Sequence, residues 1–298
     1  MNIGILSRYA NSYSTRSLVR AGLFSGHFVQ VIDHTQCSLR IEQHLPTVFH
    51  NGANLSYLDA IIPRIGASVN AQGAAVIGQF ELMNIFTCVR SEAMLQARDK
   101  LRCAQRLSSY GIDTPRTVFV GEGQDIADLV QSIGGFPVVI KMLESTHGVG
   151  VLLAENLLQT SSILEAFQKL GERVVLQEFI REAEGSDIRV VVVNGEIVAS
   201  MRRQAKEGEF RSNLHRGASA ITVELTRQEE DLSRKVARVI GLEVAGIDIL
   251  RSHRGPLIME VNASPGLEGI EMTTGIDVAG SFINLVESKV AELKLLRV

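Results

Sequence analysis

Short hydrophobic runs separated by polar turns predict an α/β start to the chain. Residues 2–6 and 28–32 are apolar runs, and a helical pattern over residues 15–25 lies between them. A strand, a helix and a strand within about thirty residues form a βαβ unit with parallel strands and a right-handed crossover. A third apolar run, residues 60–65, adds another strand. We therefore predict a Rossmann-like N-terminal domain over residues 1–96.

A charged helical pattern over residues 93–110 leads into a different arrangement. It ends at Gly111, because glycine commonly terminates helices. Short β-rich runs then alternate with helical patterns, which predicts a central subdomain over residues 97–180. The predicted strands are residues 116–120, 137–142, 150–154 and 174–179, and the predicted helices are residues 125–133 and 157–171.

Two hairpins are predicted further along the chain. Asn194-Gly195 separates the apolar runs 189–193 and 196–201, and this dipeptide is the strongest short-range hairpin signal. A second polar turn separates residues 245–250 from residues 257–261. These runs favour antiparallel strands.

An amphipathic helix is predicted over residues 277–296, and residues 181–298 then form a C-terminal subdomain. The length of 298 residues also exceeds that of a usual single domain. The predicted fold class is α/β and α+β, with the Rossmann-like domain followed by a two-part catalytic region.

Composition narrows the classes of function. Hydrophobic residues make up 45% and charged residues 21%, as in globular proteins with a sizeable core. No run of 18 apolar residues occurs and the N-terminus resembles no secretion signal, so we expect a cytoplasmic protein without a membrane partner. Three cysteines without metal or redox spacing agree with a reducing compartment. A net charge of −3 and 5% aromatic residues argue against direct nucleic-acid binding and against a non-catalytic ribosome-binding module.

The second hairpin carries a candidate metal site. Glu260 and Asn262 are two apart on a strand, so their side chains share a face, and pairing of the strands could bring Asp248 beside them. Three oxygen donors without His or Cys suit magnesium or manganese. They could instead be solvent-facing polar positions. Leu250 and Ile258 are expected on the same face, however, where an unpaired carboxylate would be costly to bury.

Two further segments could bind phosphates and a base. Lys141 ends an apolar strand six residues before His147-Gly148-Val149-Gly150, and such a loop lets backbone N–H groups approach phosphates. Strand-end lysines often only reach solvent, so this signal is weak alone. Residues 177–180 could offer backbone groups to an adenine edge, or could be an ordinary strand end.

A cationic stretch, residues 202–216, could recognise an anionic co-substrate. It carries five Lys or Arg residues against Glu207 and Glu209. Most cationic loops are solvated surface, but arginine also binds carboxylate and phosphate through two hydrogen bonds. Asp187 and Arg189 share a face of the preceding strand.

Taken together, these motifs resemble the ATP-grasp superfamily, and more closely the RimK-type α-L-glutamate ligases. The similarity covers essentially the whole chain and is specific as an ordered set. The motifs are Arg98-Asp99-Lys100, Val139-Ile140-Lys141, Gly148 with Gly150, Gln177-Glu178, residues 185–189, Arg211-Ser212-Asn213 and residues 259–266. The sequence departs from the family at His147, where relatives more often carry Gln or Ser.

The resemblance implies a pre-ATP-grasp domain followed by an ATP-grasp fold, with ATP and two Mg²⁺ or Mn²⁺ ions as cofactors. It implies that the enzyme adds L-glutamate to the C-terminal tail of a small-subunit ribosomal protein through an acyl phosphate, as a cytoplasmic homotetramer. Synthesis of free poly-α-glutamate stays open. The implied ATP-binding residues are Lys100, Lys141, Glu178, Phe179, Asp187, Arg211, Ser212 and Asn213, the implied metal ligands are Asp248, Glu260 and Asn262, and the implied catalytic residues are Arg189, Arg202 and Arg203.

Two alternatives remain at this point. A sibling ligase would use another acceptor, such as an amino-group-carrier protein or a pteridine cofactor. A non-catalytic ATP-binding module would keep the fold without ligation, but such a module has no need to retain the metal-binding set.

Overall fold

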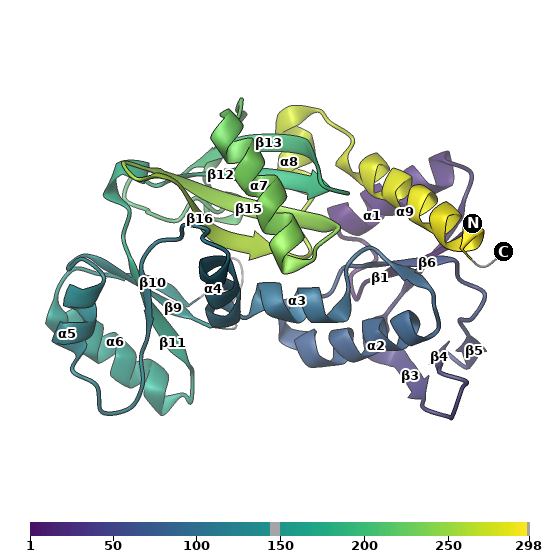
Figure 1. The fold of residues 1–298 in the computed structure, drawn as a ribbon, viewed down its shortest axis with the longest axis horizontal. Coiled ribbons are helices and arrows are strands. Elements are labelled where there is room, and N and C mark those ends of the chain that lie inside the picture. Colours follow the sequence, from purple (N-terminus) through teal and green to yellow (C-terminus); the bar gives the residue numbers. More distant parts are fainter. Residues whose placement is uncertain (144–149, 297–298) are drawn as a thin grey trace.

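A computed structural model describes residues 1–143 and 150–296, and its N-terminal part is built on a parallel sheet (Figure 1). The strand order is β2-β1-β6-β7. Helices α1 and α9 lie together on one side of this sheet, and α2 and α3 lie on the other. The elements are β1 (Asn2–Leu6), α1 (Tyr13–Phe24), β2 (Phe28–Ile32), β6 (Ala60–Pro63), α2 (Asn70–Leu82), β7 (Phe86–Thr87), α3 (Ser91–Arg98) and α9 (Val278–Leu295).

A small antiparallel sheet with its own core forms the central part, at the lower left of Figure 1. Its strand order is β10-β9-β11-β8, and α5 and α6 pack against it. The core contains Val138, Ile140, Leu164 and Leu176. The elements are β8 (Thr117–Phe119), α5 (Ile126–Ser132), β9 (Val138–Met142), β10 (Val151–Ala154), α6 (Leu157–Lys169) and β11 (Val174–Glu178).

The C-terminal part is a larger antiparallel sheet of order β14-β13-β12-β15-β16. One continuous hydrophobic core joins this sheet to the N-terminal part, whereas the central part has a separate core. The elements are β12 (Ser186–Val193), β13 (Glu196–Gln204), β14 (Ser219–Thr222), α7 (Arg227–Ile240), β15 (Val244–Ser252), β16 (Gly255–Asn262) and α8 (Glu268–Thr274). Within the described residues, every helix is too short or insufficiently apolar to cross a bilayer.

The single helical stretch predicted over residues 93–110 is wrong in one respect. It is divided into α3 and α4 (Lys100–Ser109) by Asp99, which has an extended backbone. The Asp99 side chain accepts hydrogen bonds from the backbone N–H groups of Leu101 and Arg102, so it caps α4. This break is what directs Lys100 toward the central part.

Several elements were not predicted. Helix α7 carries a capping box between Thr226 and Glu229, a signal that the sequence does contain. In helix α2 the polar and apolar residues are not separated onto two faces, and Gln79 is buried with Val76, Ile77 and Phe80, so its sequence lacks the amphipathic pattern. The other elements missed are short: β3 (Cys37–Arg40), β4 (Thr47–His50), β5 (Ala53–Asn54), β7, α8 and β14.

Two glycines of α2 provide a matched test of the packing. A Cβ on Gly73 would lie 2.4 Å from Ile65 Cγ2, whereas a Cβ on Gly78 would make ordinary contact, 3.6 Å from Ser91 Oγ. Gly73→Ala should therefore destabilise the protein by about 1–3 kcal/mol through overpacking. Gly78→Ala should stabilise it by up to about 1 kcal/mol, because alanine favours the helix. Urea denaturation followed by circular dichroism measures both, and equal midpoints for the two variants would contradict this packing.

Candidate functional site

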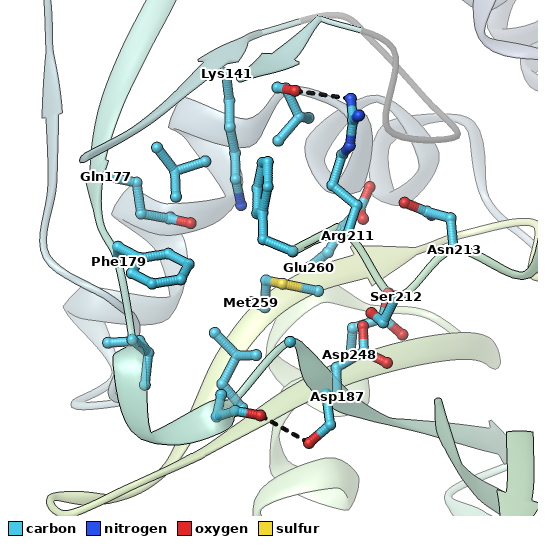
Figure 2. A pocket seen from close by; sticks show the side chains of 18 of the residues that line it. Lys141, Gln177, Phe179, Asp187, Arg211, Ser212, Asn213, Asp248, Met259 and Glu260 are labelled. Atoms are coloured by element: carbon cyan, nitrogen blue, oxygen red, sulfur yellow. Dashed lines mark hydrogen bonds between the residues drawn. The ribbon is translucent and has the colours of Figure 1, made fainter. Parts of the chain in front are cut away.

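A pocket lies between the central sheet and the C-terminal sheet (Figure 2). Its empty space, with the open mouth and its solvent included, is about 860 Å³. The structure brings most of the predicted site residues to its wall: Lys100, Lys141, Glu178, Phe179, Asp187, Arg203, Arg211, Ser212, Asn213, Asp248 and Glu260.

Lys141 is a buried cation that forms no ion pair with any residue the structure describes. It lies in β9, a strand that is otherwise apolar, and it extends into the pocket toward Met259 and Glu260 (Figure 2). Its pKa is lowered to about 8, mainly by burial and also by the charge of Lys100, and Glu260, Asp248 and Asp187 oppose this shift only in part. In the part of the chain that the structure describes, its ammonium makes no hydrogen bond or ion pair. A buried, unpaired ammonium is costly, so this wall fits a ligand that brings negative charge, such as phosphate.

Part of the pocket wall, beside Lys141, is apolar and suits a flat ring (Figure 2). Phe179 and Phe210 meet edge to face, with ring centroids 6.3 Å apart. The Glu178 carboxylate is already engaged, because Arg254 donates to it at 2.5 Å and the Arg116 backbone N–H donates at 3.1 Å. Glu178 therefore fixes the segment between the two sheets, and ring contacts and backbone groups remain for a base.

Residues 209–213 connect the C-terminal sheet to the central sheet. Arg211 donates to the backbone carbonyl of Val151 in β10 at 3.0 Å. It also donates twice to Glu209, at 2.9 and 2.8 Å, and these bonds hold the Glu209 pKa at about 2. Ser212 is buried beside Asp187 in the pocket wall and lowers the pKa of that carboxyl, against the larger effect of burial, which raises it. This segment thus covers one side of the pocket.

A chain of four alternating charges underlies the pocket floor. Arg203 donates to both carboxylate oxygens of Asp187, at 2.7 and 2.6 Å, and lies 3.0 Å from Asp248. Arg189 makes a two-point interaction with Asp248, in which Nη2 lies 2.6 Å from Oδ2. Burial opposes ionisation of Asp248, but the two arginines outweigh it and lower its pKa. Arg203 therefore holds two carboxylates in place.

The predicted metal ligands lie together. Asp248 pairs with Glu260 across β15 and β16, and Gly246 pairs with Asn262, so the expectation of a shared face is confirmed. Within the described ranges, the Glu260 carboxylate has no hydrogen-bond partner, while the Asn262 amide N–H donates weakly to Gly246 O at 3.4 Å. Asp248 has part of its acceptor capacity left, since a carboxylate offers about four lone-pair sites.

This donor set fits a divalent cation. No three His, Cys, Asp or Glu side chains cluster among residues 1–143 and 150–296, so a third protein ligand would be the Asn262 amide. Two carboxylates and one neutral amide oxygen suit Mg²⁺ or Mn²⁺, because these ions prefer oxygen ligands and complete their shells with water and phosphate.

The expectation that Ile258 shares this face is wrong. The pairing shifts between Asp248 and Ile249, so that Met259 is the extra residue of a β-bulge. Ile258 pairs with Ile249 and is buried in the core, while Met259 and Leu250 line the pocket. Met259 and Phe210 were missed as site residues because neither bulges nor ring contacts can be read from an apolar pattern.

Arg202 is not brought to the pocket. It is exposed and points to the face of β13 opposite Arg203, because neighbouring strand residues alternate. Arg189 and Asn262 are not among the residues that line the pocket: Arg189 contacts the lining residue Asp248, and Asn262 pairs with Gly246, two residues before Asp248. His147 and Gly148 lie outside the described residues.

Comparisons with known proteins agree with this architecture. A model described as a RimK-like ATP-grasp domain matches residues 97–286, and a RimK pre-ATP-grasp domain matches residues 1–94. A probable alpha-L-glutamate ligase of Aliivibrio salmonicida is 51% identical over 98% of this chain and 97% of its own length. One from Ectopseudomonas mendocina is 52% identical over 96% and 95%.

Solved structures share the fold at low identity. The ATP-grasp ligase PsnB, complexed with a minimal precursor, has a TM-score of 0.74 at 16% identity, covering 96% of this chain and 98% of PsnB. A D-alanine–D-alanine ligase from Bacillus anthracis has a TM-score of 0.69 at 16% identity, with complete coverage of both chains.

Lys141→Met should remove ADP binding and raise thermal stability, because it replaces an unpaired buried charge by an apolar side chain of similar length. The folded-state pKa of about 8 lies below an unfolded value of roughly 10.4. Between these values the unfolded state binds more protons, so the stability of the unmodified protein rises with pH there, and the variant should lose this rise. Calorimetric melting from pH 7 to 10 measures it, with exposed Lys169→Met as control. A lower melting temperature for Lys141→Met would contradict the absence of a counter-ion.

ADP affinity should fall as the pH rises through about 8, the pKa of the free Lys141 ammonium. The decrease should approach about tenfold per pH unit if one proton is required. Lys141→Arg stays charged and should give a flat profile. Titration calorimetry in a metal chelator tests this, and identical profiles for both proteins would exclude Lys141 as the titrating group.

Proposed function

The chain belongs to the RimK-like ATP-grasp family of ligases, and on that premise we propose that it joins L-glutamate to the C-terminus of an acceptor protein at the expense of ATP. The acceptor proposed is the C-terminal tail of a small-subunit ribosomal protein. One observation supports the catalytic part most directly: the buried Lys141, which has no ion-pair partner among residues 1–143 and 150–296, shares one pocket with the oxygen ligands Asp248 and Glu260.

The residues of the pocket would divide the work of binding ATP. Phe179 and Phe210 would flank the base, and Lys141 with Lys100 would hold the phosphates, whose charge satisfies the buried ammonium. Asp248, Glu260 and Asn262 would hold two Mg²⁺ or Mn²⁺ ions. Bound metal neutralises the charge that develops on the transferred phosphoryl group.

The acceptor carboxylate needs activation before an amine can attack it. We propose that it attacks the γ-phosphorus of ATP, which gives an acyl phosphate and releases ADP. The α-amino group of glutamate then attacks the acyl carbon, and phosphate leaves as the amide bond forms. Arg189 and Arg203 are ion-paired with Asp248 and Asp187, and their proposed role is to orient Asp248 beside these anions.

The names of the curated relatives favour glutamate as the amino acid, since they are called alpha-L-glutamate ligases. The ribosomal acceptor and a homotetrameric assembly come from the sequence resemblance. An amino-group-carrier protein or a pteridine acceptor would use the same ATP site, so the acceptor must be decided by experiment. Intact mass after incubation with ATP, Mg²⁺, glutamate and each acceptor distinguishes them. Mass additions of glutamyl residues to the ribosomal protein alone are expected.

Glu260→Gln should lower turnover at least about 100-fold, because it removes a metal-binding charge from the reacting end. Stability should change little, since the Glu260 carboxylate has no hydrogen-bond partner in the described part of the chain. Exposed Glu268→Gln is the control, and phosphate release measures both. Turnover retained in Glu260→Gln would contradict the metal assignment. Asp248 is a poorer target, because its loss would leave two arginines without their partner.

A further inference from the structure

Three arginines converge beside the pocket, in the N-terminal part. Arg8 follows β1, Arg64 follows β6, and Arg98 ends α3. Both Arg8 and Arg98 approach Gly66. If Gly66 carried a Cβ, that atom would lie 3.4 Å from Arg8 Nη2, and Arg98 Nη1 donates to the Gly66 carbonyl at 3.2 Å. Arg98 also lowers the pKa of Arg64, which burial brings to about 10. The three cations therefore surround one short segment.

None of these arginines has a carboxylate partner within the described residues. Their hydrogen-bond acceptors are neutral: Arg8 donates to Ser68 Oγ at 3.0 Å, Arg64 donates to the Pro265 carbonyl at 2.8 Å, and Arg98 donates to backbone carbonyls and to Asn70. One acidic influence is Asp33, whose pKa burial raises and the charge of Arg8 helps to lower without forming an ion pair. Arg64 Nη1 is buried and has no hydrogen-bond partner among these residues. Unsatisfied buried donors of this kind are rare in native structures and call for a ligand.

The topology of the parallel sheet supports a ligand here. The chain passes from β1 to β2 on one side and later returns to β6 on the other side of β1. The carboxyl ends of β1 and β6 therefore flank a switch point, where open α/β sheets bind ligands. Arg64 directly follows the last residue of β6, and Arg8 follows β1 after one intervening serine. Helix α1 also begins at this edge, and its N-terminus favours negative charge.

The arginines also lie close to the reacting end of the nucleotide pocket. Pro265, which accepts the bond from Arg64, packs on Gly246, since a Cβ there would lie 2.7 Å from Pro265 Cβ. Gly246 is two residues from Asp248 on the same face of β15 and pairs with Asn262. An anion held by Arg64 would thus lie next to the predicted metal ligands.

We propose that Arg8, Arg64 and Arg98 form the binding site for a carboxylate of the amino-acid or peptide substrate. The proposal rests on the proposed ligase function and adds the residues that select an acidic substrate. Guanidinium groups bind carboxylates through paired hydrogen bonds, and three of them suit a ligand with two carboxylates. Free glutamate and an acceptor tail ending in glutamate both have this chemistry.

Arg8→Gln is the main variant, because Arg8 is half-buried and its one hydrogen bond is to a serine. Arg64→Lys keeps the charge but loses the forked donors, and exposed Arg90→Gln is the matched control. Titration calorimetry, with a non-hydrolysable ATP analogue and Mg²⁺ present, would use two ligands: L-glutamate, and a peptide ending in Glu-Glu compared with its C-terminal amide.

Arg8→Gln and Arg64→Lys should each weaken binding by about tenfold with nucleotide affinity unchanged. The melting temperature should be unchanged in Arg8→Gln and lower in Arg64→Lys, which loses the bond to the Pro265 carbonyl. Loss confined to L-glutamate assigns the site to the free amino acid, and loss confined to the peptide assigns it to the acceptor. Unchanged affinity for both ligands overturns the proposal.

A protein that binds neither ligand before mutation would contradict the proposed function rather than the arginine site. Citrate, a tricarboxylate probe, then tests the site alone. Weaker citrate binding by Arg8→Gln than by Arg90→Gln supports it, and equal binding overturns it.

Discussion

The site depends on the buried chain of charges that runs from Asp187 through Arg203 and Asp248 to Arg189. These side chains come from β12, β13 and β15, so their interactions fix the relative positions of three strands. Two carboxylates and two guanidinium groups neutralise one another, which makes their burial tolerable. They also hold Asp248 opposite Glu260 at the floor of the pocket.

Because these four charges neutralise one another, the charged groups that lack partners among the described residues indicate where ligands bind. Lys141 and Glu260 face the same pocket from different sheets, and neither has an ion-pair partner in the described residues. The arginines at the switch point are similar, since they bond only to neutral acceptors. Charges that the protein itself does not satisfy mark the positions where phosphate, metal and carboxylate are proposed to bind. The pocket lies between the central part, which has its own hydrophobic core, and the C-terminal part, which shares its core with the N-terminal part.

The sequence predicted both hairpins and the strands outside the short ones β3, β4, β5, β7 and β14, because apolar runs and Asn194-Gly195 are local signals. It also placed Asp248, Glu260 and Asn262 together, since residues two apart share a face and hairpin strands pair. The sequence prediction was wrong where the face to which a side chain points depends on tertiary structure. The bulge at Met259 reverses the face of Ile258, and the same alternation that brings Arg203 inward leaves Arg202 outside. Arg8, Arg64 and Arg98 are far apart in sequence, so only the folded sheet reveals that they converge.

The central claim is that one pocket holds phosphate on Lys141 and divalent metal on the oxygen ligands of β15 and β16. Anomalous diffraction from crystals grown with Mn²⁺ and a non-hydrolysable ATP analogue tests it most directly. The account predicts manganese peaks within coordination distance of Asp248, Glu260 and Asn262 oxygens, with a phosphate oxygen beside Lys141 Nζ. Nucleotide bound with manganese remote from these three side chains, or with Lys141 still lacking an anion, would contradict it.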